Sequence, residues 1–152
     1  TIETNGTLPL PAKVFRRTDL LTISPKLTNS GMVDRLNLHN LAMLLEHENP
    51  QLKFVCESTA DVMEALRLCN HLRETYTSPT TEVPIVFQPQ GLLKPSSFEI
   101  TDIASLQTTM YLKLLKELWG FVLGCKEIYK DWDLRVLPQL HRLVFGPNVR
   151  KV

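Results

Sequence analysis

The sequence predicts an α/β fold in which parallel strands alternate with helices. Five short apolar stretches each end in polar residues, and the segments between the later ones carry apolar residues at the helical period. Strand, helix and strand follow one another at about 30 residues per unit, which is the spacing of βα units in a parallel sheet. The carboxyl ends of parallel strands meet at one rim, and in such folds that rim carries the chemistry.

The five strands are predicted from an apolar core followed by a polar tip. They lie within residues 1–7, 20–26, 52–58, 84–91 and 135–141. At 152 residues the chain has the length of a single domain, spanning residues 1–152. The first strand begins at once, and a bare edge in a parallel sheet is a liability. We therefore expect that the chain is the second half of a larger protein, or that a partner segment covers this edge.

Three helices are predicted between the later strands. They cover residues 34–48, a stretch that begins after Ser58, and residues 101–130. Ser58 followed by Asp61 resembles a capping box at the start of the second helix. The connection over residues 8–17 holds Pro9 and Pro11, so it predicts a short helix at most.

Composition narrows the classes of partner and compartment. The net charge of +1 and the scattered Lys and Arg give no bias toward nucleic acid or an anionic membrane. No apolar run is long enough for a transmembrane helix, and no leader is visible. The three cysteines are widely spaced, which is not the pattern of a disulfide framework. A reducing, cytoplasmic setting is expected. The histidines at 39, 47 and 71 are expected to be solvated.

Five blocks in order resemble the 7-carboxy-7-deazaguanine synthase family, the radical S-adenosylmethionine (SAM) lyases of queuosine biosynthesis, a tRNA modification pathway. The blocks are Glu3-Thr-Asn-Gly-Thr7, Leu21-Thr-Ile-Ser-Pro-Lys26, Leu52-Lys-Phe-Val55, Phe87-Gln-Pro89 and Arg135-Val-Leu-Pro-Gln-Leu-His141. The resemblance extends from Thr1 to about Gly146. It implies that the chain is the second half of a radical SAM-type partial (β/α)6 barrel with a parallel sheet.

The chain departs from the family in one respect. The Cys-x-x-x-Cys-x-x-Cys loop and the Gly-Gly-Glu-Pro-type strand of the family's N-terminal part are missing, and Cys56, Cys69 and Cys125 have the wrong spacing to replace that loop. The resemblance therefore implies a 4Fe-4S cluster and a Mg²⁺ ion whose ligands lie outside this chain. It also implies two partners, the N-terminal half of the same enzyme and a second copy in a homodimer.

The resemblance assigns cofactor-binding residues to three blocks. SAM would be contacted by Ser24, Pro25 and Lys26, by Glu3, Thr4 and Asn5, and at its adenine end by Gln88, Pro89, Gln90 and Gly91. A Ser hydroxyl and a Lys ammonium can bind ribose hydroxyls or a methionine carboxylate. Each block also has a plain structural interpretation as a turn that ends a strand.

The last block is assigned to the substrate. Gln139 and His141 would face the pterin, because residues two apart on a strand share a face. Because the pKa of histidine lies near neutrality, His141 would also suit the transfer of a proton during the reaction. The structural alternative is a histidine that caps the last strand.

The implied reaction is the ring contraction of 6-carboxy-5,6,7,8-tetrahydropterin to 7-carboxy-7-deazaguanine, with loss of ammonia. This chain would supply part of the SAM and substrate pockets and would be inactive alone. Two alternatives stay open: a non-catalytic α/β binding module, and a radical SAM relative, such as an activating enzyme, with another substrate. The block from Arg135 to His141 disfavours the second alternative, because it is the least generic of the five.

Overall fold

A computed structural model describes residues 1–76, 82–90 and 103–140 and shows a five-stranded parallel sheet, which confirms the α/β class. The strands stand in chain order, β1-β2-β3-β4-β5. The elements are β1 (Ile2–Thr4), α1 (Ala12–Arg16), β2 (Leu21–Ile23), the 3-10 turns η1 (Thr28–Ser30) and η2 (Val33–Arg35), α2 (Leu38–Leu45), β3 (Pro50–Cys56), α3 (Thr59–Tyr76), β4 (Ile85–Pro89), α4 (Ile103–Cys125) and β5 (Leu134–Val136).

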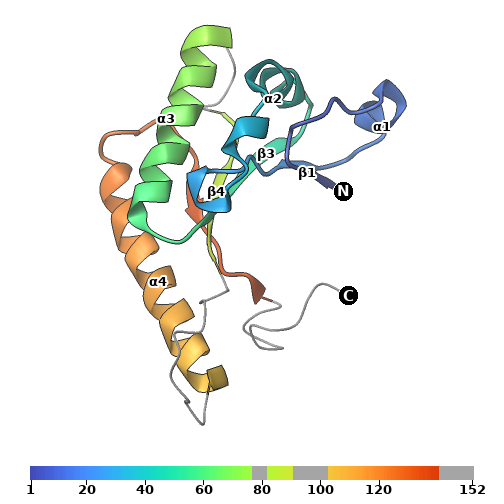
Figure 1. Ribbon diagram of the computed structural model, residues 1–152. Coiled ribbons are helices and arrows are strands. Elements are labelled where there is room, and N and C mark those ends of the chain that lie inside the picture. Colours follow the sequence, from blue (N-terminus) through green and yellow to red (C-terminus); the bar gives the residue numbers. More distant parts are fainter. Residues whose placement is uncertain (77–81, 91–102, 141–152) are drawn as a thin grey trace.

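The longer helices form one layer against one face of the sheet (Figure 1). α3 packs against α2 on one side and α4 on the other, while α4 also contacts β4 and β5. Right-handed connections between neighbouring parallel strands place successive helices on the same face. The strand order therefore accounts for a single helix layer.

Burial alternates along β3, and the face of the sheet toward the helices is apolar. In β3, Leu52 and Phe54 are fully buried, and the register pairs them with Ile85 and Phe87 of β4. The rings of Phe54 and Phe87 stack with their centroids 6.1 Å apart. The core lies between this face and the apolar sides of α2, α3 and α4.

The opposite face of the sheet, called the polar face below, carries mostly polar side chains. By alternation and register its members are Glu3, Thr22, Gln51, Lys53, Val55, Val86, Gln88 and Arg135. Parallel sheets usually read as apolar runs because both faces are covered. A polar second face therefore needs an explanation beyond stability.

Two helix boundaries differ from those predicted. α2 begins at Leu38 rather than near residue 34, because the Asn37 side chain accepts a hydrogen bond from Asn40 N at 3.0 Å and caps the helix there. α4 ends at Cys125 rather than near residue 130. At α3 the predicted capping interaction is present on the Asp61 side, since its Oδ2 accepts from Ser58 N at 3.1 Å.

The β1–β2 connection contains only the short helix α1, as predicted. The side chain of His47 binds this connection at Phe15. The expectation that His47 is solvated is wrong, because its side chain is 8% exposed. His47 Nδ1 accepts from Asn49 N at 3.0 Å, so Nε2 carries the proton and donates to the Phe15 carbonyl at 3.1 Å. The ring also meets Phe15 edge-on at 5.0 Å.

The turn after β1 requires glycine at position 6. Gly6 has a φ of +76°, and a Cβ there would lie 2.2 Å from Leu41 Cδ2. Its carbonyl accepts a hydrogen bond from Asn40 Nδ2 at 2.7 Å. α2 thus holds the turn by shape and by a buried hydrogen bond.

Replacing Gly6 with alanine should therefore cost far more than the same change at Gly31. Both have positive φ, but a Cβ at Gly31 would meet nothing within 4 Å. We expect Gly6→Ala to lower the free energy of unfolding by about 3 kcal/mol and Gly31→Ala by about 1 kcal/mol, measured by urea denaturation. Equal losses would contradict a close contact between this turn and Leu41.

Candidate functional site

The polar segments that follow the strands gather at one rim of the sheet, as predicted. Because all pairings are parallel, the carboxyl ends of the five strands lie at the same edge. Asn5, Ser24, Glu57 and Gln90 each follow directly after the end of a strand. This rim and the polar face make up the candidate site.

The Thr4–Asn5 turn is held by its own side chains. Thr4 Oγ1 accepts from Gly6 N at 3.2 Å, and Asn5 Oδ1 accepts from Thr7 N at 3.1 Å. The Thr7 hydroxyl also donates to Asn5 Oδ1 at 2.8 Å. These bonds are those of an Asx-type turn, so Thr4 and Asn5 have a structural role beside any ligand.

Ser24, Pro25 and Lys26 lie beside that turn. The backbone N–H of Ser24 donates to the Thr4 carbonyl at 2.7 Å, which joins two of the blocks assigned to SAM. Ser24 is 4% exposed, Pro25 is buried and Lys26 is half-buried. The structure therefore brings the first two predicted groups together and leaves the Lys26 side chain within reach of solvent.

Charged and polar side chains bridge β1, β2 and β3 on the polar face. Lys53 of β3 forms an ion pair with Glu3 of β1, and their side chains are 15% and 41% exposed. Beside them, Gln51 Nε2 donates to Thr22 Oγ1 at 2.7 Å. The sequence interpretation missed Lys53, Gln51 and Thr22. The signal was present, because strand alternation opposes Gln51 and Lys53 to the buried Leu52 and Phe54.

A second ion pair lies at the other end of the sheet. Arg135 of β5 meets Asp133 through Nε–Oδ1 and Nη2–Oδ2 contacts of 2.9 and 2.5 Å. The Asp133 carboxylate raises the pKa of the Arg135 guanidinium, first through these hydrogen bonds and then through its charge. Between the two ion pairs the polar face carries Val86, with Val55 paired to Gln88 in the next row.

The Gln88–Gln90 block and Gln139 are also neighbours. Gln90 N donates to the Cys56 carbonyl at 2.7 Å, and Gln139 Nε2 donates to the Pro89 carbonyl at 3.1 Å. The expectation that Gln139 lies on a strand is wrong, because β5 ends at Val136. Gly91 and His141 lie outside the described residues.

A hollow of about 240 Å³ lies where β3 and β4 end against α4. It is lined by Glu57, Gln90, Gln107, Met110, Tyr111, Lys113, Leu114 and Glu117. Gln107 Oε1 is buried there and has no hydrogen-bond partner among the described residues. A buried acceptor without a partner is costly, so this atom suits a ligand or water that donates a hydrogen bond.

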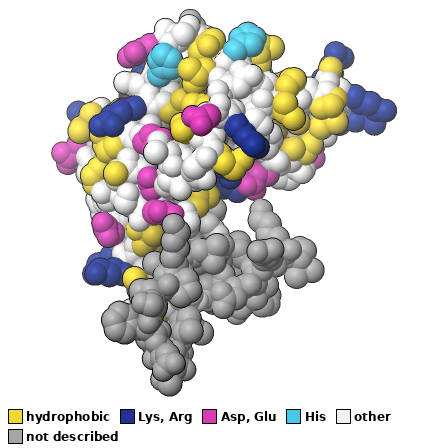
Figure 2. Space-filling model, viewed as in Figure 1, with side chains coloured by type: hydrophobic (Ala, Val, Ile, Leu, Met, Phe, Trp, Pro, Cys, Tyr) yellow, Lys and Arg dark blue, Asp and Glu magenta, His cyan; other side chains and the backbone are white. Residues whose placement is uncertain are grey.

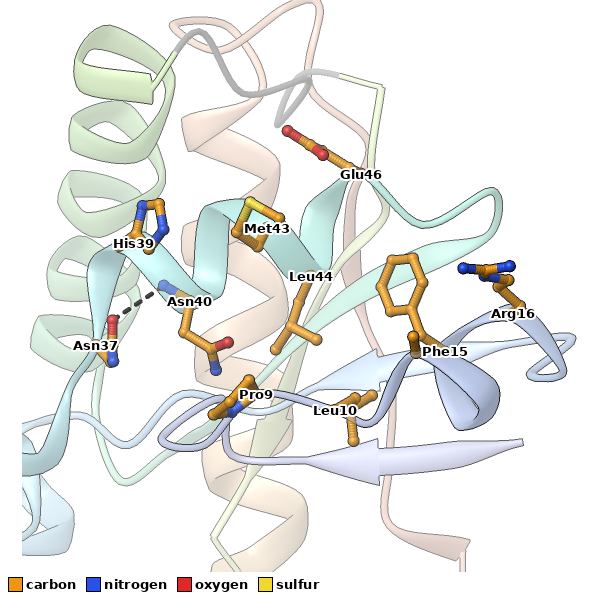
Figure 3. Close-up of a pocket in the computed structure, with 11 residues that line it drawn as sticks. Pro9, Leu10, Phe15, Arg16, Asn37, His39, Asn40, Met43, Leu44 and Glu46 are labelled. Carbon is orange, nitrogen blue, oxygen red and sulfur yellow. Dashed lines mark hydrogen bonds between the residues drawn. The ribbon is translucent and has the colours of Figure 1, made fainter.

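A larger cavity of about 560 Å³ lies away from these residues, between the β1–β2 connection and α2 (Figure 3). Its lining consists of Pro9, Leu10, Ala12, Phe15, Arg16, Asn37, His39, Asn40, Met43, Leu44 and Glu46. Basic side chains gather at the α1 end of the molecule, beside this cavity (Figure 2). The cavity contains none of the residues assigned from the sequence, and Asn40 connects it to the rim.

The three cysteines are buried and do not form a group that could hold a metal ion. Cys56, Cys69 and Cys125 are buried and form no disulfide, and burial raises the pKa of each thiol. Metals bind the thiolate, which a raised pKa disfavours. Over residues 1–76, 82–90 and 103–140, no group of three or more His, Cys, Asp or Glu could hold a metal ion. None of the helices in these ranges is long and apolar enough to cross a membrane.

Comparison of the chain with protein families, with curated proteins and with solved structures found no match. The chemistry of the site is therefore inferred from its own residues. Those that lie together are the Thr4–Asn5 turn, Ser24 to Lys26, the Gln88–Gln90 block and Gln139, with the polar face extending from the rim.

We expect the rim turn to depend on Asn40 far more than on the Glu3–Lys53 ion pair. Asn40→Ala removes the partner of the Gly6 carbonyl and should cost about 1–3 kcal/mol of unfolding free energy. Glu3→Gln removes one charge of a partly exposed pair and should change it by less than about 1 kcal/mol. Urea denaturation of both variants measures the difference, and a larger loss for Glu3→Gln would refute this ranking.

The native thiols should react slowly with an alkylating reagent such as iodoacetamide at pH 8, because burial disfavours the thiolate. In denaturant all three cysteines should be labelled quickly. Mass spectrometry of the labelled chain counts the modified residues. Fast labelling of Cys56 in the native state would contradict its burial.

Proposed function

We propose that this chain supplies part of the SAM pocket and part of the substrate pocket of a radical SAM enzyme resembling 7-carboxy-7-deazaguanine synthase. The proposed reaction is the ring contraction of 6-carboxy-5,6,7,8-tetrahydropterin to 7-carboxy-7-deazaguanine. The observation that carries the proposal is the one-sided sheet: helices cover one face, while the other face and the carboxyl rim carry polar residues. This arrangement fits the wall of a partial barrel that binds ligands inside.

The first three strands offer groups that suit the amino acid and ribose parts of SAM. The methionine end of SAM carries an ammonium and a carboxylate, and the polar face carries Glu3 and Lys53 already paired with each other. A zwitterion can exchange partners with such a pair without adding net charge. The Ser24 hydroxyl and the Lys26 ammonium, beside the Thr4–Asn5 turn, suit ribose hydroxyls or the carboxylate.

The fourth strand suits a purine and a pterin. The buried Gln107 Oε1, in the hollow beside Gln90, could accept a hydrogen bond from the exocyclic amino group of adenine. On the polar face, the half-buried Val55 is an apolar side chain that a flat heterocycle could contact, and Gln88 is its partner in the register. Gln139, held at Pro89, would address the substrate, together with His141.

The remaining groups of the reaction would come from elsewhere. By the resemblance, the 4Fe-4S cluster and the Mg²⁺ ion would be held by the N-terminal half of the enzyme. Among the described residues, no group of three or more His, Cys, Asp or Glu could hold a metal ion. When bound beside such a cluster, SAM supplies the radical that starts the reaction. β1 is an edge of the described sheet, and its backbone could pair with that half. We also propose a homodimer, and a cytoplasmic setting in keeping with three cysteines that form no disulfide.

The test is anaerobic production of the full gene product, with analysis of iron and sulfide and an assay of 6-carboxytetrahydropterin turnover with SAM and a reductant. We expect bound cluster and deazaguanine product. Ser24→Ala and Lys26→Ala should each weaken SAM binding roughly tenfold, the loss of one charge-assisted or neutral hydrogen bond. Lys13→Ala, at an exposed lysine of α1, is the control and should leave it unchanged.

Other outcomes point to the two alternatives. A protein that carries a cluster and cleaves SAM but leaves the pterin intact would be a radical SAM relative with another substrate. A protein without iron that neither binds SAM nor forms product would contradict the proposal and favour a non-catalytic α/β binding module.

A further inference from the structure

The end of β5 departs from a regular parallel ladder. Leu137 N donates to the Phe87 carbonyl at 3.0 Å, so a continued ladder would have Gln139 N donate to the Pro89 carbonyl. Pro89 instead accepts from the side chain of Gln139, through Nε2 at 3.1 Å. The backbone N–H of Gln139 donates to the hydroxyl of Tyr111 at 2.5 Å.

Tyr111 reaches this point from α4. Its side chain is 7% exposed, so the ring is fixed by packing and the hydroxyl has little freedom to move. The residue between Leu137 and Gln139 is Pro138, which has no N–H to offer. The N–H of Gln139 is therefore the first backbone donor after Leu137, and Tyr111 takes it.

We propose that Tyr111 is a positioning residue for Gln139. By accepting the backbone N–H of Gln139, the hydroxyl holds that donor away from the Pro89 carbonyl and leaves the carbonyl to the Gln139 side-chain amide. The amide is then held at the rim beside Gln88 and Gln90. This inference rests on the proposed function for the statement that Gln139 contacts the substrate.

Two donors of the same residue compete for one carbonyl. Holding the side-chain amide on Pro89 costs the rotamer freedom of a glutamine, and the backbone N–H carries no such cost. Without the hydroxyl the backbone donor should win. The side-chain amide of Gln139 would then leave the Pro89 carbonyl.

The variant Tyr111→Phe tests this in the full gene product, because it keeps the ring and removes the acceptor. Its crystal structure should show Gln139 N within hydrogen-bond distance of the Pro89 carbonyl and the side-chain amide away from it. Pterin binding should weaken roughly tenfold, while SAM binding stays within twofold. Tyr129→Phe is the control, since Tyr129 packs against Trp132 and should tolerate the change.

A double-mutant comparison separates positioning from a general loss of structure. In a Gln139→Ala background, Tyr111→Phe should change pterin binding by less than about twofold, because its effect acts through the missing side chain. Equal effects in both backgrounds, or a Gln139 amide still on Pro89 in the variant structure, would overturn the inference. If the wild-type protein binds no pterin, the proposed function fails, and the variant structure still decides whether Tyr111 positions Gln139.

Discussion

The packing of Phe54 on Phe87 between the sheet and the helix layer sets the rest of the structure. A strand slipped by one residue would exchange its two faces, so burial of these rings fixes which side chains point away from the helices. Lys53 and Gln88 then have to lie on the other face, near Glu3 and Val86. The polar face is therefore a consequence of the core and also the reason to look for a ligand.

Side chains of α2, α3 and α4 also hold the segments of the rim in place. Asn40 and Leu41 of α2 fix the turn at Gly6 by a hydrogen bond and by close contact. Tyr111 of α4 takes the N–H of Gln139, and Asp61 of α3 caps its own helix at Ser58. Each of these three helices thus holds one segment of the rim, so the geometry of a ligand site would depend on residues behind the rim as well as on those that touch the ligand.

The sequence was sufficient to predict the strands and the rim, because apolar cores followed by polar tips survive as local patterns. The sequence pattern places the start of α2 too early, because the true start depends on a single side-chain hydrogen bond, from Asn40 N to Asn37 Oδ1. It kept Gln139 on a strand because the contact with Tyr111 joins residues 28 apart. Lys53 lies within β3 rather than at a strand end, and alternation along the strand is the pattern that predicts its face.

Hydrogen–deuterium exchange of the full gene product with and without SAM tests most directly whether the polar face and its rim bind the ligand. The account predicts slower exchange in residues 3–7, 22–27 and 86–90, and no change in the outer turns of α3. Slower exchange confined to residues 9–16 and 37–46, which line the larger cavity between α1 and α2, would contradict it.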